Sequence, residues 1–164
     1  MATIISADNG TVSGTAGLKS SADSSGILIL QTGANTTGLT IDASQNATFA
    51  GPLLNPTVTN YVETTYTANT STALTVSLSN GTIQILTLTA NATITMPTAV
   101  AGKSFVIILR QDATGSRSVT WTTVNWPSAT APTITGTASK QDIFSFFSNG
   151  TSWYGTTIGQ NYTQ

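Results

Sequence analysis

The chain contains neither cysteine nor histidine, and only eleven of its 164 residues carry a charge, five of them Lys or Arg and six Asp or Glu. It can therefore form no disulfide bond, no thiolate or imidazole metal site, and no nucleophile of the Ser-His-Asp or Cys-His type. A net charge of −1 provides no attraction to nucleic acid. The sequence also lacks a secretory signal and an apolar run of about 18 residues, so we expect no membrane insertion. Neither a cofactor nor a metal ion is expected.

Hydroxyl side chains are abundant, with 34 threonines and 18 serines. Thr, Val and Ile favour pleated sheets over helices, and short runs of these residues alternate with Gly, Asn, Asp and Ser. This pattern predicts an all-β protein. Several short strands with regular turns favour an antiparallel β-sandwich or jelly roll.

The composition changes at residues 51–60, where Pro52 and Pro56 interrupt any strand ladder. We therefore predict three parts: an N-terminal β segment over residues 1–50, a proline-containing linker over 51–60, and a β-sandwich domain over 61–164.

Residues 1–50 contain no Trp or Tyr and a single Phe, Phe49. So few large side chains bury too little surface to offset the entropy of ordering the chain. A flexible arm is one interpretation. We favour a segment that interlocks with identical copies, because the run Ile27, Leu28, Ile29 and Leu30 is apolar on both faces of a strand. These four residues are the candidates for an oligomer interface.

Two Asn-Gly pairs predict hairpin turns in the second half. The pair at residues 80–81 would set Leu78 opposite Ile83 and Val76 opposite Ile85, with a bulge after Ile85. The pair at residues 149–150 would set Phe146 opposite Trp153. The run 105–109 is apolar at every position and predicts a central strand.

Acid–base chemistry has little support in the sequence. The six carboxylates are scattered, and only Asp112 and Asp142 could meet if their strand ends adjoin, as a glycosidase pair would. Turn caps are the favoured interpretation. Several Thr-X-Thr pairs raise the idea of an ice-binding or solenoid face, but they follow no fixed period, so we do not favour it.

Four aromatic residues could stack on sugars. Trp121 and Trp153 lie in alternating strands and are assigned to the core. Trp126, beside Pro127, and Tyr154, opposite in phase to Trp153, are the receptor-contact candidates. We expect such a site at the outer end of residues 61–164, binding by neutral stacking and amide contacts.

Several segments resemble those of a known family. They include GKSF at 102–105, LRQDATGSR at 109–117, VTW at 119–121, NGTSWY at 149–154 and GQNY at 159–162. In this order, within residues 81–162, they resemble the C-terminal β-domain of bacteriophage tail fibre and related virion proteins. GTAGLK at 14–19, DSSG at 23–26 and LTIDASQNATF at 39–49 are similar to N-terminal segments of phage fibres. The resemblance implies a homotrimeric, non-enzymatic virion component, assembled in the host bacterial cytoplasm.

Three functions remain open. The leading hypothesis is a short trimeric tail-fibre-like protein for host attachment, with other tail or baseplate proteins and host surface polysaccharide as partners. A capsid decoration, cement or head-fibre protein would use the same two parts on the shell. A polysaccharide depolymerase is the least favoured.

Overall fold

The computed structural model describes residues 27–32 and 36–164. The chain divides between Thr59 and Asn60 into two compact units, each described by itself here. Asp8, Asp23 and the motifs at 14–19 and 23–26 lie outside the described residues.

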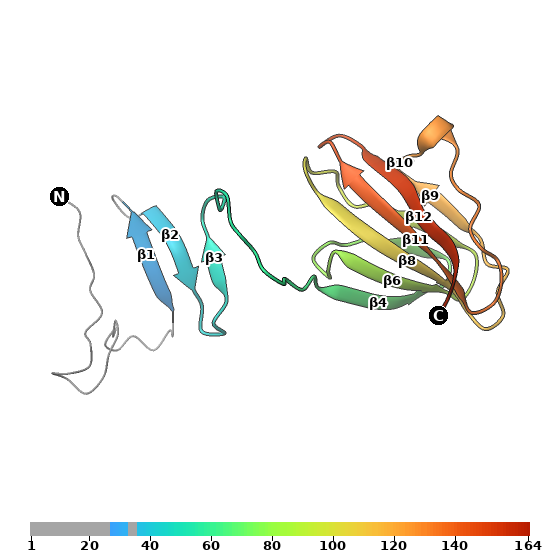
Figure 1. The fold of residues 1–164 in the computed structure, drawn as a ribbon, viewed down its shortest axis with the longest axis horizontal. Helices are drawn as coiled ribbons and strands as arrows, with labels where there is room; N and C mark the ends of the chain where they lie inside the picture. Colours follow the sequence, from blue (N-terminus) through green and yellow to red (C-terminus); the bar gives the residue numbers. More distant parts are fainter. Residues whose placement is uncertain (1–26, 33–35) are drawn as a thin grey trace. The chain divides into compact units, whose positions relative to one another are not determined.

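The N-terminal unit holds one antiparallel sheet in the order β1-β2-β3, formed by Leu28–Thr32, Thr36–Ile41 and Ala47–Phe49 (Figure 1). Leu28 pairs with Ile41, and Leu30 pairs with Leu39, which in turn pairs with Phe49. Directly paired residues share a face, so these five side chains lie on one side of the sheet. None of the side chains described between residues 27 and 59 is buried.

The second unit begins as a flattened coil of three turns. β4, β6 and β8 (Thr65–Thr70, Ile83–Leu88, Ser104–Gln111) pair in parallel in one sheet. β5, β7 and β9 (Ala73–Thr75, Ala92–Thr95, Val119–Thr122) pair in parallel in a second sheet. The chain therefore alternates between the two sheets, with one strand in each sheet per turn.

A C-terminal hairpin then widens the first sheet. β11 (Lys140–Ser148) pairs antiparallel with β8, and β12 (Trp153–Thr163) pairs antiparallel with β11. The short β10 (Val124–Asn125) pairs in parallel with β12, and a 3-10 turn follows at Pro127–Ala129. The large sheet thus has six strands in the order β10-β12-β11-β8-β6-β4 (Figure 1), and the small sheet has three.

The hydrophobic core belongs to this second unit. Aromatic rings dominate it: Phe105 stacks on Phe146 at 4.9 Å between ring centroids, and Trp153 meets the edge of Phe105 at 5.0 Å. The buried core residues are Val76, Leu86, Leu88, Ala92, Ile94, Met96, Phe105, Ile107, Leu109, Trp126, Phe144, Phe146 and Trp153. The all-β prediction is confirmed, and 105–109 is central in the large sheet as expected.

The hairpin predicted at residues 80–81 is wrong. The turn exists, since Gly81 N–H donates to Leu78 C=O at 3.3 Å, but it carries the chain from one sheet to the other. The buried Gln84 amide holds this crossing by donating to the carbonyls of Ser77 (3.2 Å) and Gly81 (2.5 Å). No bulge follows Ile85, because β6 alternates regularly and its two faces are both apolar.

The hairpin at residues 149–150 is confirmed, with a different register. The loop has four residues, so Ser148 pairs with Trp153 and Phe147 with Tyr154, and Phe146 lies opposite Gly155. Asn149 makes the longer loop possible because its side-chain oxygen accepts the N–H groups of Thr151 (3.0 Å) and Ser152 (2.9 Å).

The path of the chain through the second unit resembles a short solenoid, an interpretation that we did not favour from the sequence. Two of the Thr-X-Thr pairs stack in register, Thr93 on Thr120 and Thr95 on Thr122. The absence of a sequence period has a structural reason. Thr65, Ile83 and Val106 align across the large sheet, so the turns of the coil differ in length by several residues.

Candidate binding clefts at the linker end of the domain

Strand directions define two ends of the second unit. β4, β6, β8 and β12 all start at the end where the chain arrives from the linker, and β11 finishes there. We call this the linker end. Ile83 N–H donates to the carbonyl of Thr64 at 3.3 Å, just where β4 begins. The far end carries the loops at 89–91, 112–118 and 136–139.

An aromatic cleft of about 320 Å³ lies at the linker end, along the edge formed by β10 and β12. Asn125, Trp126, Pro127, Phe147, Tyr154, Gly155 and Thr156 line this cleft. Phe147 is 55% exposed and stacks on Tyr154, with ring centroids 5.2 Å apart and planes inclined by 17°. The Asn149 side-chain amide donates to the Tyr154 hydroxyl at 3.3 Å. None of the lining residues that the structure describes carries a charge.

The structure brings the two receptor-contact candidates, Trp126 and Tyr154, to the same cleft. Trp126 is only 9% exposed and packs on Trp121, Phe144 and Phe146, so it belongs to the core. Both candidates lie at the linker end of the second unit, and a receptor site at the outer end of residues 61–164 stays a prediction.

Sequence reasoning missed Phe147 as the exposed ring of this cleft. The sequence contained a signal for it. Phe144 and Phe146 point inward, so Phe147, which directly follows them in the strand, must point outward. Gly155 completes the wall for a steric reason. A Cβ at this position would lie 2.7 Å from the Trp126 ring, so glycine allows Trp126 to pack against β12.

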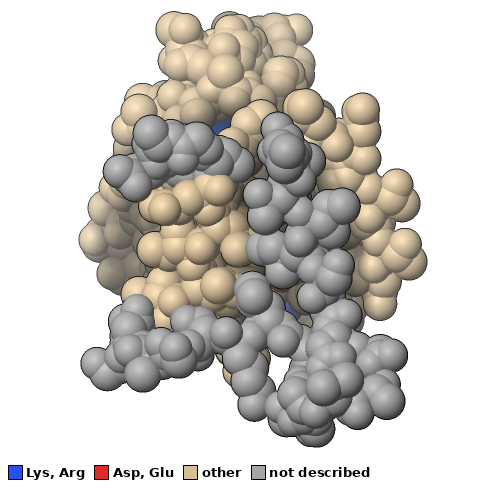
Figure 2. Space-filling view, turned by 90° about the vertical axis from the view of Figure 1, so that its left-hand side faces the viewer, with Lys and Arg blue, Asp and Glu red and all other residues tan. Residues whose placement is uncertain are grey.

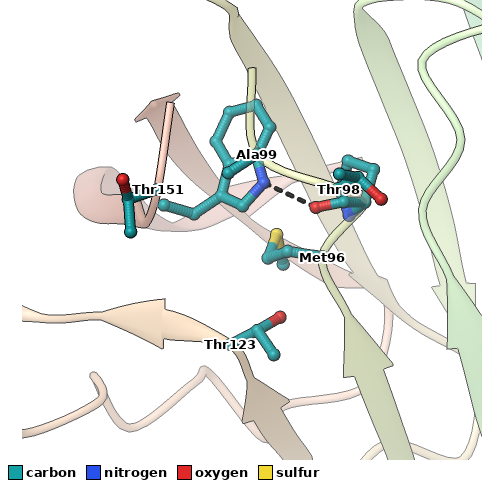
Figure 3. Close-up of a pocket in the computed structure, with 7 residues that line it drawn as sticks. Met96, Thr98, Ala99, Thr123 and Thr151 are labelled. Carbon is teal, nitrogen blue, oxygen red and sulfur yellow. Dashed lines mark hydrogen bonds between the residues drawn. The ribbon is translucent and has the colours of Figure 1, made fainter. Parts of the chain in front are cut away.

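A second, smaller pocket of about 260 Å³ opens beside the first, between the loop after β7 and the hairpin loop. Figure 3 shows Thr98, Thr123 and Thr151 around it, with Met96 at its base. The Trp153 indole N–H donates to the Pro97 carbonyl at 2.7 Å, drawn as the dashed line in Figure 3. This hydrogen bond ties the pocket wall to the core.

The two carboxylates considered for acid–base chemistry are both held in structural hydrogen bonds. Asp142 is buried and accepts the backbone N–H groups of Thr135 (2.6 Å) and Asn161 (2.9 Å) and the Gln160 amide (3.1 Å). Asp112 pairs with Arg117 at 2.9 Å in the far-end loop. This guanidinium hydrogen bond lowers the pKa of the Asp112 carboxyl below its usual 3.8.

The visible surface is nearly free of charge. On the side of the molecule shown in Figure 2, the described residues are tan almost throughout, with little blue and no red. Within residues 27–32 and 36–164, no three acidic side chains gather as metal ligands do. In the same residues, no helix is long and apolar enough to cross a membrane.

The oligomer-interface candidates lie on β1 and just before it. Ile27, Ile29 and Leu30 are 45%, 49% and 42% exposed within the chain, and Leu28 is half-buried. The structure separates them by face: Leu28 and Leu30 join the apolar side of the small N-terminal sheet, while Ile29 shares the other side with Thr40.

Comparison with known protein families finds a match. A family model described as "Putative phage tail fibre C-terminal domain" matches residues 54–153, which is more than half of the chain. The match covers the coil, β11 and the hairpin loop, and includes most of the residues that line both clefts. No curated protein and no solved structure matches the chain.

Proposed function

The chain belongs to the family of phage tail fibre C-terminal domains, and we propose that it works as a short homotrimeric fibre component that attaches the virion to its host. Family membership makes it a structural, tail-fibre-like component of the virion, associated with other virion proteins. The proposal adds the trimer, the attachment role, a host surface polysaccharide as receptor, and assembly in the host bacterial cytoplasm.

The N-terminal sheet supports self-association. Its apolar face carries Leu28, Leu30, Leu39, Ile41 and Phe49, and none of these side chains is fully buried by the described residues 27–32 and 36–59. A single three-stranded sheet that leaves its apolar face exposed buries little surface, so a partner that covers this face would stabilise it. Identical copies supply a matching apolar face for each other, so residues 27–59 serve as the interlocking base of the fibre.

The aromatic cleft is the observation that supports attachment. Phe147 and Tyr154 form a stacked, partly exposed pair beside a cleft whose volume suits a small neutral ligand. Asn125, Thr156 and Asn149 supply amide and hydroxyl groups nearby, which can exchange hydrogen bonds with sugar hydroxyls. A sugar chain of the host surface fits this chemistry better than a charged ligand does, because the described lining residues include no charged side chain that could form an ion pair with it.

Binding of the purified protein to host cells tests the attachment role. Phe147→Ala should lower binding about tenfold, the loss that 1.4 kcal/mol at one aromatic contact produces. Val100→Ala is the matched control, because Val100 is 51% exposed in the loop after β7 but does not line the cleft. Binding should also change little between low and physiological salt, since there are few charges to screen. Equal binding by both variants would remove the cleft from the proposal.

Trp126→Ala is unsuited to that assay. Its buried ring contacts three core aromatics, so we expect the variant to lose stability. A loss of binding by this variant would then reflect unfolding and not the loss of a receptor contact.

A capsid decoration or head-fibre role is the second candidate. Exposed apolar side chains in the linker and just after it favour this role: Leu54 is 84% exposed and Val62 is 91% exposed. An extended apolar segment of this kind can lie along neighbouring subunits of a shell. Imaging intact virions with the protein labelled separates the two roles: label confined to the tail supports the fibre, and label spread over the shell supports decoration.

A further inference from the structure

The outer face of the six-stranded sheet is unusually apolar for a surface. Ile83, Ile85, Val106, Ile108 and Ile143 are half-buried, point away from the core, and are not among the residues packed against it. Ile85, Ile108 and Ile143 align directly across three neighbouring strands. We call these five residues the aliphatic face. Figure 1 shows the large sheet from this side, with no other element of residues 60–164 across it.

The small sheet provides the contrast within the same domain. Its outward positions are almost all threonine, arranged in two aligned rows. These positions are Ala73, Thr93 and Thr120 in one row and Thr75, Thr95 and Thr122 in the other. A sheet with one solvated face normally shows polar residues on that face. The small sheet obeys this rule and the large sheet breaks it, so the aliphatic face is not adapted to water.

We propose that a second copy of this chain covers the aliphatic face, which makes the large sheet an interface between the β-domains of the oligomer. This inference rests on the proposed homo-oligomer and adds a contact outside the N-terminal segment. Identical faces can meet around the threefold axis of the proposed trimer, because none of the five residues of the aliphatic face carries a charge. Arg110 is the charged side chain on this side of β8, and its guanidinium already donates to Gln141 at 2.9 Å.

The area of the sheet is sufficient for such a contact. Six strands spaced about 4.8 Å apart and about seven residues long present roughly 500 Å² per copy. Three such faces packed around a threefold axis bury about 1,500 Å² in total, which is of the size of specific interfaces. The exposed Phe147 at the linker end of the same face extends the apolar surface further.

A cysteine-accessibility experiment tests the proposal, because the chain has no cysteine of its own. Ser145→Cys places a thiol on the outward side of β11, where Ser145 pairs with Val106. Thr93→Cys is the matched control, since Thr93 is also half-buried and points outward from the middle strand of the small sheet. Both full-length variants are labelled with a maleimide, and each rate is normalised to that of the same variant in denaturant.

In a chain that sediments as an oligomer, we expect the normalised labelling rate of Ser145→Cys to be about tenfold or more below that of Thr93→Cys. Equal rates in an oligomeric chain would overturn the aliphatic-face interface while leaving the proposed trimer through residues 27–59 intact. A wild-type chain that sediments as a monomer would overturn both. As a second measurement, Ile85→Thr with Ile108→Thr should weaken the association detected by sedimentation, and unchanged association would also overturn the proposal.

Discussion

Residues 27–59 and residues 60–164 are both β-structure made from the same hydroxyl-rich composition, yet they treat apolar side chains in opposite ways. The second unit encloses thirteen apolar residues in a core between two sheets. The first has one sheet, and every side chain described in it is at least partly exposed. The two units differ because only the second has another sheet, and an apolar face needs another layer to cover it.

The contrast teaches where each unit obtains its stability. The second unit can draw on its own core, whereas the first depends on whatever covers Leu28, Leu30, Leu39, Ile41 and Phe49. Changes in the first unit should therefore act on association, and changes in the second should act on unfolding.

The largest expected effect is on association. Leu30→Asp puts a charge on the apolar face of the N-terminal sheet and should convert the proposed trimer to monomers, since it removes about 2 kcal/mol of burial per copy and adds a desolvation cost. Sedimentation measures the outcome. Thr48→Asp, on the opposite face of the same sheet, is the control and should leave the oligomer intact. An unchanged oligomer with Leu30→Asp would show that this face is not an interface.

The next largest effect is on the core. Phe144 is fully buried and lies 5.4 Å from Trp121 between ring centroids, so Phe144→Ala should lower the free energy of unfolding by about 3–5 kcal/mol. Denaturant titration of the full chain measures it. Phe147→Ala removes the same ring from the exposed side of the same strand and should cost far less. Similar losses for the two variants would mean that the faces of β11 are misassigned.

A smaller effect is expected at the hairpin loop. Gly150 has a φ of +99°, and a Cβ there would lie 3.1 Å from the Ala101 side chain. Gly150→Val should therefore destabilise the second unit by about 1 kcal/mol or more. Gly51 in the linker has open space around it, so Gly51→Val should leave the thermal midpoint unchanged. Equal midpoints for both variants would contradict the loop conformation.

The smallest effect compares one carboxyl in each unit. Hydrogen bonds from the Asn46 side chain and backbone lower the pKa of Asp42, and the Arg117 hydrogen bond lowers that of Asp112, both from 3.8. Each stabilising contribution is thus present above pH 3.8 and is lost as the pH falls through the lowered folded-state pKa.

Thermal midpoints between pH 2 and pH 7 measure both contributions. The thermal midpoints of Asp42→Asn and Asp112→Asn should each lie below that of wild type at neutral pH and converge with it in acid. The difference should be slight, because exposed pairs contribute little. A gap that persists at pH 2 would show that the effect is not electrostatic. Asp112→Asn should shift the unfolding of the domain, and Asp42→Asn the association-linked transition.

Much of the candidate site depended on facts that local patterns do not contain. From the sequence, Trp126 beside a proline could serve either as a receptor contact or as a structural residue. Gly155 leaves room for its ring against β12, and the ring enters the core. Tyr154 was placed correctly on the outward side, opposite in phase to Trp153. The pairing of Phe147 with Tyr154 became visible only once the register of the hairpin was known, because the four-residue loop shifts every partner by two positions relative to the predicted two-residue turn.

The sequence by itself determined that the chain is all-β, that it has no thiol or imidazole chemistry, that Gly150 takes a positive φ, and which apolar runs form strands. These follow from residue type and from alternation within a few positions. The tertiary structure alone decided which strands pair and in which direction. Val76 and Ile85 could have met across a hairpin, but the buried Gln84 amide holds the 77–81 turn as a crossing between sheets. Strand partners are chosen by packing between residues far apart in the chain, so a pattern that fixes the faces of each strand leaves its neighbours open.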